Sequence, residues 1–401
     1  MPCALSNEPS AYNVSMPATA TPSPPSPPQR ASQHAKDFWQ RVSEGMELNQ
    51  LWSQFMAEAR TSYGLYSREF KRDHVADLRR GRRLWALAKQ FFWAVLMKLS
   101  PARRIILLVA VVFLVVPMIQ VQVSDSGVNV GGSSLAFWGG VLLLGLLVLE
   151  IADRVTMKRD LEIAREIQHW LVPEKPPQIA GLDVAFVSRP ANTVAGDYYD
   201  VIPMDLDGQG PNVLLAVADV AGKSLPAALL MATFQASLRT LTTTGRSLPE
   251  LVRGVNRYAC QHSRGGQRFT TAFLARLNPA TGELIYTNAG HNAPLLWRAS
   301  GTLDRLDVGG VPLGIQADFP YECGSAMVKP GDMLVIFTDG VVEAVNQRGE
   351  EYDESRLIPL VQRCAGLKAQ GLLDTLMFEL KIFVGQASQH DDITCMAVRI
   401  C

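Results

Sequence analysis

Two long uncharged stretches dominate the hydrophobic pattern of the chain. They run from Ile105 to Ser124 and from Ser126 to Leu149, 20 and 24 residues, with only Asp125 between them. A helix of about 20 apolar residues crosses the hydrocarbon layer of a bilayer. The pattern predicts two transmembrane helices within residues 104–152, at about 105–122 and 134–151. A buried hairpin in a soluble fold is the alternative, but adjacent uncharged runs of this length are uncommon there.

Basic residues flank this predicted hairpin on its two outer sides, and the connecting segment between the spans has none. By the positive-inside rule, both flanks are expected in the cytoplasm, so that the N-terminus and the C-terminal region lie on the same side. The flanking basic residues are Arg103, Arg104, Arg154, Lys158 and Arg159.

The first hundred residues divide into two compositions. Residues 1–35 are rich in proline, which predicts a disordered tail because such a segment cannot bury a core. From Lys36, apolar residues recur at helical spacing, and residues 36–103 are predicted to form a basic amphipathic helical region. Between Arg60 and Arg104 there are twelve Lys or Arg and three acidic residues. A nucleic-acid surface has a similar composition, but the apolar runs that follow favour membrane lipid and no nucleic acid.

Residues 153–172 are charged and carry apolar positions near heptad spacing, which indicates a signalling or linker helix. A homodimer through this helix is one interpretation, because heptads are the pattern of coiled coils. A helix that packs on the next domain fits about three heptads equally well. The near-heptad positions are Val155, Met157, Leu161, Ala164, Ile167 and Leu171.

Beyond Pro173 the pattern changes to short β-rich runs punctuated by Gly and Pro, with helices between them. Residues 226–241, 247–262 and 372–384 are expected to be helical. The fold class is therefore α+β with mainly antiparallel strands, because the strands lack regular crossover helices. The predicted strands are 183–188, 213–218, 270–277, 284–288, 333–337 and 393–400.

Four acidic segments occur where apolar runs end, and they are interpreted as turns. Magnesium and manganese prefer carboxylate and carbonyl oxygens, and a neighbouring glycine lets the backbone approach an ion. Each segment alone is an ordinary Asp or Gly turn, whereas the set of four could converge on one two-metal site. The segments are Ala195–Asp200 (AGDYYD), Ala218–Ser224 (ADVAGKS), Phe337–Gly340 (FTDG) and His390–Thr394 (HDDIT).

Charge, cysteine spacing and one further motif indicate no other kind of binding site. The 401 residues carry 38 basic and 38 acidic side chains, so net charge indicates no particular partner. The six cysteines form no CxxC pair, which argues against a zinc site and a disulfide framework. The sequence at 222–224 (GKS) matches the last three residues of the phosphate-binding P-loop motif. That motif also requires a glycine at the position of Val217, so the chain does not contain it.

The motifs, in their order and in their residues, resemble those of the SpoIIE and RsbU branch of metal-dependent type-2C serine/threonine phosphatases. The resemblance extends from about Leu161 to the C-terminus, over some 230 residues. Besides the four acidic segments, it includes EIQHWLVP at 166–173, NAGHNAP at 288–294, PLGI at 312–315 and TDGVVEA at 338–344.

This resemblance implies an αββα sandwich of two mainly antiparallel sheets at residues 173–401, with two Mn²⁺ or Mg²⁺ ions at one edge. Asp219 would bridge the ions with help from the Val220 carbonyl. Asp339 and Asp391 would complete one ion, with Asp392 as the alternative to Asp391. Asp197 would serve the other ion, directly or through water.

The implied activity is hydrolysis of phosphoserine or phosphothreonine on a phosphorylated regulatory protein, namely a STAS-type anti-anti-sigma factor in partner switching. The implied location is the bacterial cytoplasmic membrane. A catalytically silent scaffold for the same partner and a two-metal nucleotide-processing enzyme are the alternatives. Intact acidic positions oppose the scaffold, and the motif set gives the nucleotide enzyme no support.

Two departures and two histidines affect the expected mechanism. Ala195 replaces a usual glycine, and Ala221 stands where eukaryotic relatives often carry a candidate acid histidine. Leaving-group protonation is therefore expected from metal-bound water. His291 and His390 are interpreted as structural rather than as metal ligands, because no second histidine has ligand spacing.

Overall fold

The computed structural model describes residues 93, 96, 97, 99–120, 132–205, 211–222, 225–263 and 268–401. The predicted proline-rich tail and nearly all of the predicted basic helical region lie outside these residues. The chain divides into two compact units, Met1–Leu146 and Leu147–Cys401, which are described separately.

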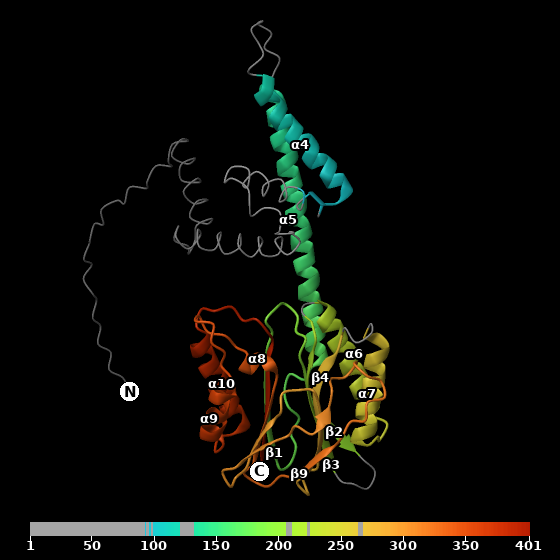
Figure 1. Cartoon of the computed structure of the whole chain (residues 1–401), viewed down its shortest axis with the longest axis vertical. Coiled ribbons are helices and arrows are strands. Elements are labelled where there is room, and N and C mark those ends of the chain that lie inside the picture. Colours follow the sequence, from blue (N-terminus) through green and yellow to red (C-terminus); the bar gives the residue numbers. More distant parts are fainter. Residues whose placement is uncertain are drawn as a thin grey trace, which may run out of the picture. The chain divides into compact units, whose positions relative to one another are not determined.

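Two helices carry the apolar runs, and Figure 1 shows them in cyan and green. Helix α4 spans Pro101–Gln120 and helix α5 spans Gly132–Leu171. A side chain at Gly139 of α5 would come within 3.0 Å of the Ala110 carbonyl of α4, so the glycine permits this close approach. Among the described residues, one helix has the length and apolarity to cross a membrane, at Ser134–Leu171. This helix contains the predicted span at about 134–151, whereas the predicted span at about 105–122 lies on α4, and crossing of a membrane by either stays a prediction.

Helix α5 joins two segments that the sequence separates. Its first part is the second apolar run, and its last part is the charged segment predicted as a linker helix, yet the structure has 40 consecutive helical residues. No glycine or proline lies between Leu146 and Leu171 to interrupt the backbone hydrogen bonds. The predicted linker helix is therefore the continuation of the membrane-type helix.

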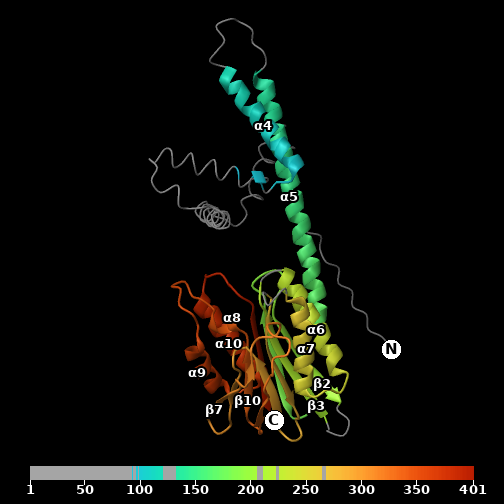
Figure 2. The same cartoon turned by 45° about the vertical axis from the view of Figure 1, so that its right-hand side comes forward.

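The unit Leu147–Cys401 contains the predicted αββα sandwich (Figures 1 and 2). One sheet has the strand order β1-β11-β10-β6-β7, and the other has β2-β3-β4-β5-β8 with β9 also paired to β5. All pairings are antiparallel except β5 with β8. The first sheet consists of β1 (Leu182–Arg189), β6 (Leu295–Trp297), β7 (Leu303–Arg305), β10 (Met333–Phe337) and β11 (Ile393–Ile400). The second consists of β2 (Tyr198–Asp205), β3 (Pro211–Val220), β4 (Thr270–Leu277), β5 (Glu283–Ala289), β8 (Gly309–Gly310) and β9 (Gly324–Met327).

Strand alternation builds three apolar layers. In β3, Leu214 faces one layer and its neighbour Leu215 faces another, because successive side chains of a strand point to opposite faces. In β10, Ile336 and Phe337 divide in the same way. The central layer lies between the two sheets, and each outer layer is closed by a pair of helices.

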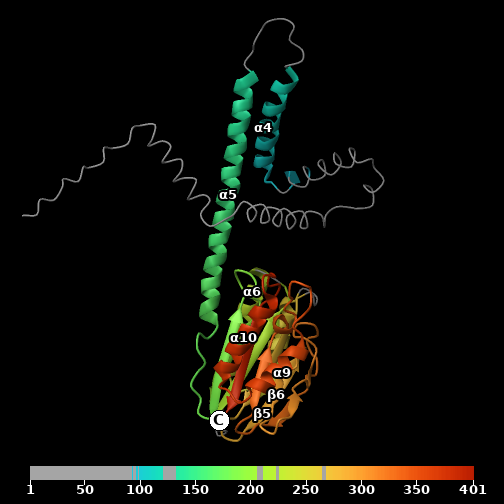
Figure 3. The same ribbon diagram turned by 90° about the vertical axis from the view of Figure 1, so that its left-hand side faces the viewer.

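One helix pair covers each sheet, as Figures 2 and 3 show. Helices α6 (Leu225–Thr242) and α7 (Leu248–His262) pack on the six-stranded sheet, and α9 (Glu354–Cys364) and α10 (Ala369–Val384) pack on the other. Helix α7 begins as the capping-box spacing predicts, with Glu250 accepting a 3.0 Å hydrogen bond from the Ser247 N–H. The one-turn helix α8 (Asp339–Val342) follows β10 directly.

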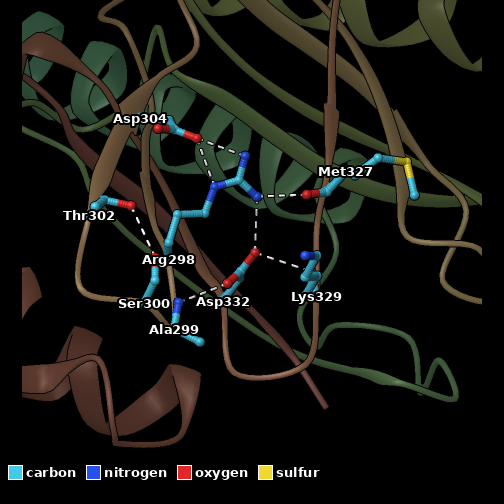
Figure 4. Close-up of polar contacts among 8 residues, drawn as sticks. All are labelled: Arg298, Ala299, Ser300, Thr302, Asp304, Met327, Lys329 and Asp332. Atoms are coloured by element: carbon cyan, nitrogen blue, oxygen red, sulfur yellow. Dashed lines mark hydrogen bonds and ion pairs between the residues drawn. The ribbon is translucent and has the colours of Figure 1, made fainter.

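A buried ion pair joins two loops at the β6 end of the sandwich (Figure 4). The Asp332 carboxylate is 2% exposed and accepts from the Arg298 guanidinium at 3.0 Å. It also accepts from the backbone N–H groups of Ala299 and Lys329, at 2.8 and 3.0 Å. Asp304 contacts the same guanidinium from outside at 2.7 Å and is 47% exposed. Asp332 therefore accepts from the two backbone N–H groups and is the buried partner of Arg298, which also donates to Asp304 and to the Met327 carbonyl.

We expect Asp332→Ala to lower the free energy of unfolding by about 3 kcal/mol, because it leaves two backbone N–H groups unpaired and removes the buried partner of the Arg298 guanidinium. Asp304→Ala is the matched control, since it removes an exposed partner of the same arginine and should cost less than about 1 kcal/mol. Urea denaturation measures both values. Equal losses of unfolding free energy in the two variants would show that the burial of Asp332 does not determine its contribution to stability.

Candidate metal centre

Four predicted acidic side chains come together at one edge of the sandwich. Asp219 is the second-last residue of β3 and belongs to the six-stranded sheet, whereas Asp339 opens α8 directly after β10 of the other sheet. Asp197 and Asp391 precede β2 and β11. The prediction that all four acids lie in turns after strands is therefore wrong, since Asp219 lies within a strand and two of the acids precede strands.

Mutual repulsion marks these carboxylates as neighbours. Burial, followed by the charges of Asp339 and Asp391, raises the pKa of Asp219 to about 7. Burial, followed by the charge of Asp219, raises the pKa of Asp197 well above its ordinary value. A buried group of like charges is unfavourable unless protons or cations neutralise it.

Asp197 is held from the opposite sheet. Its side chain is 3% exposed and accepts a 2.9 Å hydrogen bond from the Thr338 hydroxyl, which lies between β10 and α8. The same hydroxyl oxygen accepts from the Thr394 N–H of β11 at 3.0 Å. Thr338 therefore links Asp197 to the ends of β10 and β11 that lie next to Asp339 and Asp391 in the chain.

Asp391 and Asp392 differ sharply in their contacts. One carboxylate oxygen of Asp392 accepts from the Ala191 N–H at 2.7 Å, and the other accepts from the Gly196 N–H at 2.6 Å. Asp392 is 8% exposed. Asp391 is partly exposed, and its carboxylate accepts from the Asp392 N–H at 3.0 Å. Asp392 thus fixes the loop that leads to Asp197.

Two glycines permit the close approach of backbones at this edge. A Cβ at Gly340 would lie 2.0 Å from the Asp392 carbonyl oxygen, so only glycine fits between Asp339 and the Asp391–Asp392 segment. A Cβ at Gly196 would lie 3.2 Å from the Val220 carbonyl oxygen, the atom predicted to assist metal binding. The glycines beside Asp197 and Asp339 therefore let backbone segments pack closely, and close approach of the backbone to an ion stays a prediction.

The loop before Asp197 is also held by the end of helix α5, a contact that sequence analysis missed. The Gln168 amide donates to the Ala195 carbonyl at 2.7 Å and accepts from the Ala195 N–H at 2.9 Å. Its only signal was its place in the EIQHWLVP motif. Beside it lies a cleft of about 520 Å³ that Glu166, His169 and Asp197 help to line.

Asp200, the second acid of the AGDYYD motif, belongs to a different network. It is fully buried, and its two oxygens accept from Arg239 of α6 at 2.8 and 2.9 Å. The Tyr198 hydroxyl donates to it at 2.5 Å. Asp200 therefore fastens α6 to β2 and is not one of the clustered acids.

His291 has the surroundings of a structural residue. Its backbone N–H donates to Asn288 at 2.7 Å, and its Nδ1 lies 3.0 Å from the Thr271 hydroxyl. Burial lowers the pKa of His291 to about 4, so the ring is neutral at pH 7. Its Nε2 has no hydrogen-bond partner among the described residues. Thr271 lies opposite Asp219 in the sheet, so His291 packs behind the acidic cluster.

The donor chemistry of the cluster fits hard divalent cations, because it consists of carboxylates and one backbone carbonyl. As the side chains stand, the described residues contain no group of three or more His, Cys, Asp or Glu in an arrangement that could hold an ion. The neighbouring charges are nevertheless close enough to contribute to the raised pKa values of Asp219 and Asp197.

Comparisons with known proteins give the family. The SpoIIE family (Stage II sporulation protein E) matches residues 209–400. Phosphoserine phosphatase RsbU of Bacillus subtilis (strain 168) is similar to this chain, 32% identical over 248 residues that make up 61% of the chain and 70% of RsbU. Protein IcfG of Synechocystis sp. is 27% identical over 282 residues, 63% of this chain but only 43% of IcfG.

A solved structure agrees on the fold. The SiaA-PP2C domain of Pseudomonas aeruginosa superposes with a TM-score of 0.55 at 19% identity, and the match covers 62% of this chain and 99% of that domain. The sandwich, the order of the motifs and the similarity to RsbU lead to one conclusion: the chain belongs to the SpoIIE family of PP2C-type phosphatases.

Proposed function

We propose that the chain is a protein phosphatase that uses two divalent cations, Mn²⁺ or Mg²⁺, to hydrolyse phosphoserine or phosphothreonine on a regulatory protein. The observation that carries this proposal is the convergence of acidic segments from both sheets, where burial, followed by the charges of Asp339 and Asp391, raises the pKa of Asp219. The PP2C family is metal-dependent. The proposed ligands are Asp197, Asp219, the Val220 carbonyl, Asp339 and Asp391.

The chain's own residues would hold this centre together. Thr338 orients Asp197, and Asp392 and Gln168 fix the loop before it. Gly196 and Gly340 keep the backbones close enough for carboxylates of both sheets to share a centre. When bound, two cations would lower the pKa of a bound water and neutralise phosphoryl oxygens. Ala221 cannot donate a proton, so in the proposed reaction the leaving group is protonated without a histidine at that position.

The contacts of Asp392 support Asp391 as the metal ligand. Both oxygens of Asp392 already accept backbone N–H groups, and turning either toward an ion would leave a buried donor unsatisfied. Asp391 is partly exposed beside Gly340 and contributes to the raised pKa of Asp219.

The proposed substrate is a phosphorylated STAS-type anti-anti-sigma factor in a partner-switching pathway. Support comes from the similarity to RsbU, whose name is that of a phosphoserine phosphatase.

We further propose that α4 and α5 anchor the chain in the bacterial cytoplasmic membrane and that the catalytic unit lies in the cytoplasm. Helix α5 is also proposed to pair in a homodimer. The apolarity of Ser134–Leu171 and the exposed apolar side chains of its charged half, such as Val155 and Ile163, support these proposals.

Helix α5 supplies a route for regulation. Its last turn contacts Ala195 through Gln168, two residues before Asp197. A change at the other end of this continuous helix would therefore act on the loop that carries a proposed ligand. Deleting residues 1–148 should alter activity or its response in cells, and unchanged behaviour would contradict this route.

We expect the full-length protein to release phosphate from p-nitrophenyl phosphate and from a phosphoserine peptide only when Mn²⁺ or Mg²⁺ is present. Asp219→Asn should lower kcat/KM for both substrates by at least about 100-fold, because it removes the proposed bridging ligand. Asp318→Asn is the control and should retain activity, because the Asp318 carboxylate is 84% exposed and lies far from Asp219 in the sequence. Metal-independent release, or full activity of Asp219→Asn, would sink the proposed mechanism.

Asp391→Asn and Asp392→Asn should differ in kind. Asp391→Asn should abolish the rise in Tm that Mn²⁺ produces, without lowering the stability of the metal-free protein. Asp392→Asn should lower the free energy of unfolding by about 1–3 kcal/mol, because one buried N–H loses its acceptor, and should keep a rise in Tm with Mn²⁺. Thermal unfolding with and without Mn²⁺ checks both, and the reverse pattern would assign Asp392 as the ligand.

The stability of the metal-free protein should fall as pH rises from about 4 to 7. The pKa of Asp219 is raised to about 7 in the folded chain, against about 3.9 in an unfolded one, so the folded state binds the extra proton over this window. Urea denaturation across the window measures the fall, which Asp219→Asn should reduce and Asp318→Asn should preserve. A stability that rises over the same window would contradict the raised pKa.

A further inference from the structure

A second, smaller pocket adjoins the acidic cluster on the side of helix α10. It has a volume of about 230 Å³ and lies between the α8 turn, the last turns of α10 and residues 385–391. Gly340 and Asp391 form part of its wall, so it opens directly beside two segments of the proposed metal centre. We refer to it as the α10 pocket.

The α10 pocket has an apolar floor and a charged rim. Ala344, Leu380 and Ile393 contribute the buried part of its lining, at 8%, 2% and 4% exposure. Arg189 and Lys381 are exposed at the rim. Glu343 and His390 are also exposed lining residues, so the rim carries charges of both signs.

Hydrogen bonds from the Gln389 side chain and from the backbone give the pocket a defined wall. The Gln389 amide donates to the carbonyl oxygens of Arg189 and Asp391, both at 2.8 Å, and so joins the end of β1 to the segment before β11. The Gly385 N–H donates to the Lys381 carbonyl at 3.1 Å, and Gly385, with a positive φ, follows the last residue of α10. Binding sites of this kind are usually largely formed before the ligand arrives.

Size and position together indicate the occupant. Pockets for drug-sized molecules measure about 300–1,000 Å³, so a volume of about 230 Å³ suits one amino-acid side chain better than a nucleotide. A polypeptide that presents a phosphorylated residue to the acidic cluster has neighbouring side chains within reach of Gly340 and Asp391, and an apolar one would cover the floor at Leu380.

Resting on the phosphatase function proposed above, we propose that the α10 pocket is a specificity subsite that receives an apolar side chain flanking the phosphorylated residue of the substrate protein. Burial of that side chain against Leu380 and Val384 contributes affinity. Lys381 and Arg189 at the rim favour an acidic residue next to it. The subsite thus selects the sequence around the phosphate, whereas the acidic cluster acts on the phosphate itself.

The test compares short phosphoserine peptides that differ only in carrying Leu or Gly at each position flanking the phosphoserine. With full-length protein and Mn²⁺, Leu at one of these positions should raise kcat/KM by about tenfold over Gly, as expected for burying one such side chain. p-Nitrophenyl phosphate, which has no flanking residues, reports the metal centre alone.

Val384→Trp fills the pocket and should reduce the Leu-over-Gly ratio to about one. Ile382→Trp is the matched control: it lies two residues away on α10, is 66% exposed and does not line the pocket, so the ratio should stay near tenfold. Lys381→Glu changes only the exposed rim, and should lower kcat/KM several-fold for a peptide with Asp beside the Leu relative to one with Asn.

The outcomes separate the two proposals. If the wild-type protein hydrolyses the peptides but shows no preference for Leu at any flanking position, or if Val384→Trp keeps the preference, the subsite is overturned and the phosphatase function stands. If neither the peptides nor p-nitrophenyl phosphate is hydrolysed with metal, the proposed function itself fails. If Val384→Trp misfolds and loses p-nitrophenyl phosphate turnover, Lys381→Glu provides the test. A ratio of kcat/KM for the Asp peptide to kcat/KM for the Asn peptide that is unchanged from wild type overturns the subsite.

Discussion

Electrostatic repulsion among aspartates that two sheets bring to one edge is the constraint on which this structure depends. Asp219 arrives on one sheet, and Asp339 and Asp391 arrive on the other. Each is placed by strands whose side chains fill the apolar layer between the sheets, so packing energy holds like charges together. Burial, followed by the charges of Asp339 and Asp391, raises the pKa of Asp219. A cation, a proton or a movement of the edge has to relieve the repulsion.

The surrounding contacts can be understood as the means of holding that edge in place. Thr338 and Asp392 make hydrogen bonds across the two sheets, and Gln168 adds a contact from α5. None of these side chains needs to touch a phosphate to matter, because each determines where Asp197 stands. The buried pair of Asp200 and Arg239 sets the helix α6 against β2 in the same way.

Much of the fold could be predicted from sequence because it depends on local patterns. The strands at 270–277, 333–337 and 393–400 were predicted with correct bounds, since apolar runs bordered by glycine, asparagine or acidic residues are local signals. Strand β2 was missed because its AGDYYD start has the composition of a turn. Strands β6 to β9 have two to four residues each, too few for any periodicity to appear.

The acidic site was predicted as a set of residues, but its internal order was not. Asp391 and Asp392 are adjacent and chemically identical, and what separates them is the N–H groups of Ala191 and Gly196, about two hundred residues earlier in the chain. No spacing rule reports a partner at that distance.

The pairing of β1 with β11 has a consequence for synthesis. Strand β11 lies between β1 and β10, and its register with β1 runs without interruption from Leu182 opposite Ile400 to Arg189 opposite Ile393. A ribosome makes β1 long before β11, so β1 and β10 have to wait for their shared neighbour. The segment that carries Asp391 and Asp392 emerges just ahead of that strand. Closure of this sheet and completion of the acidic edge therefore depend on the same segment of the chain.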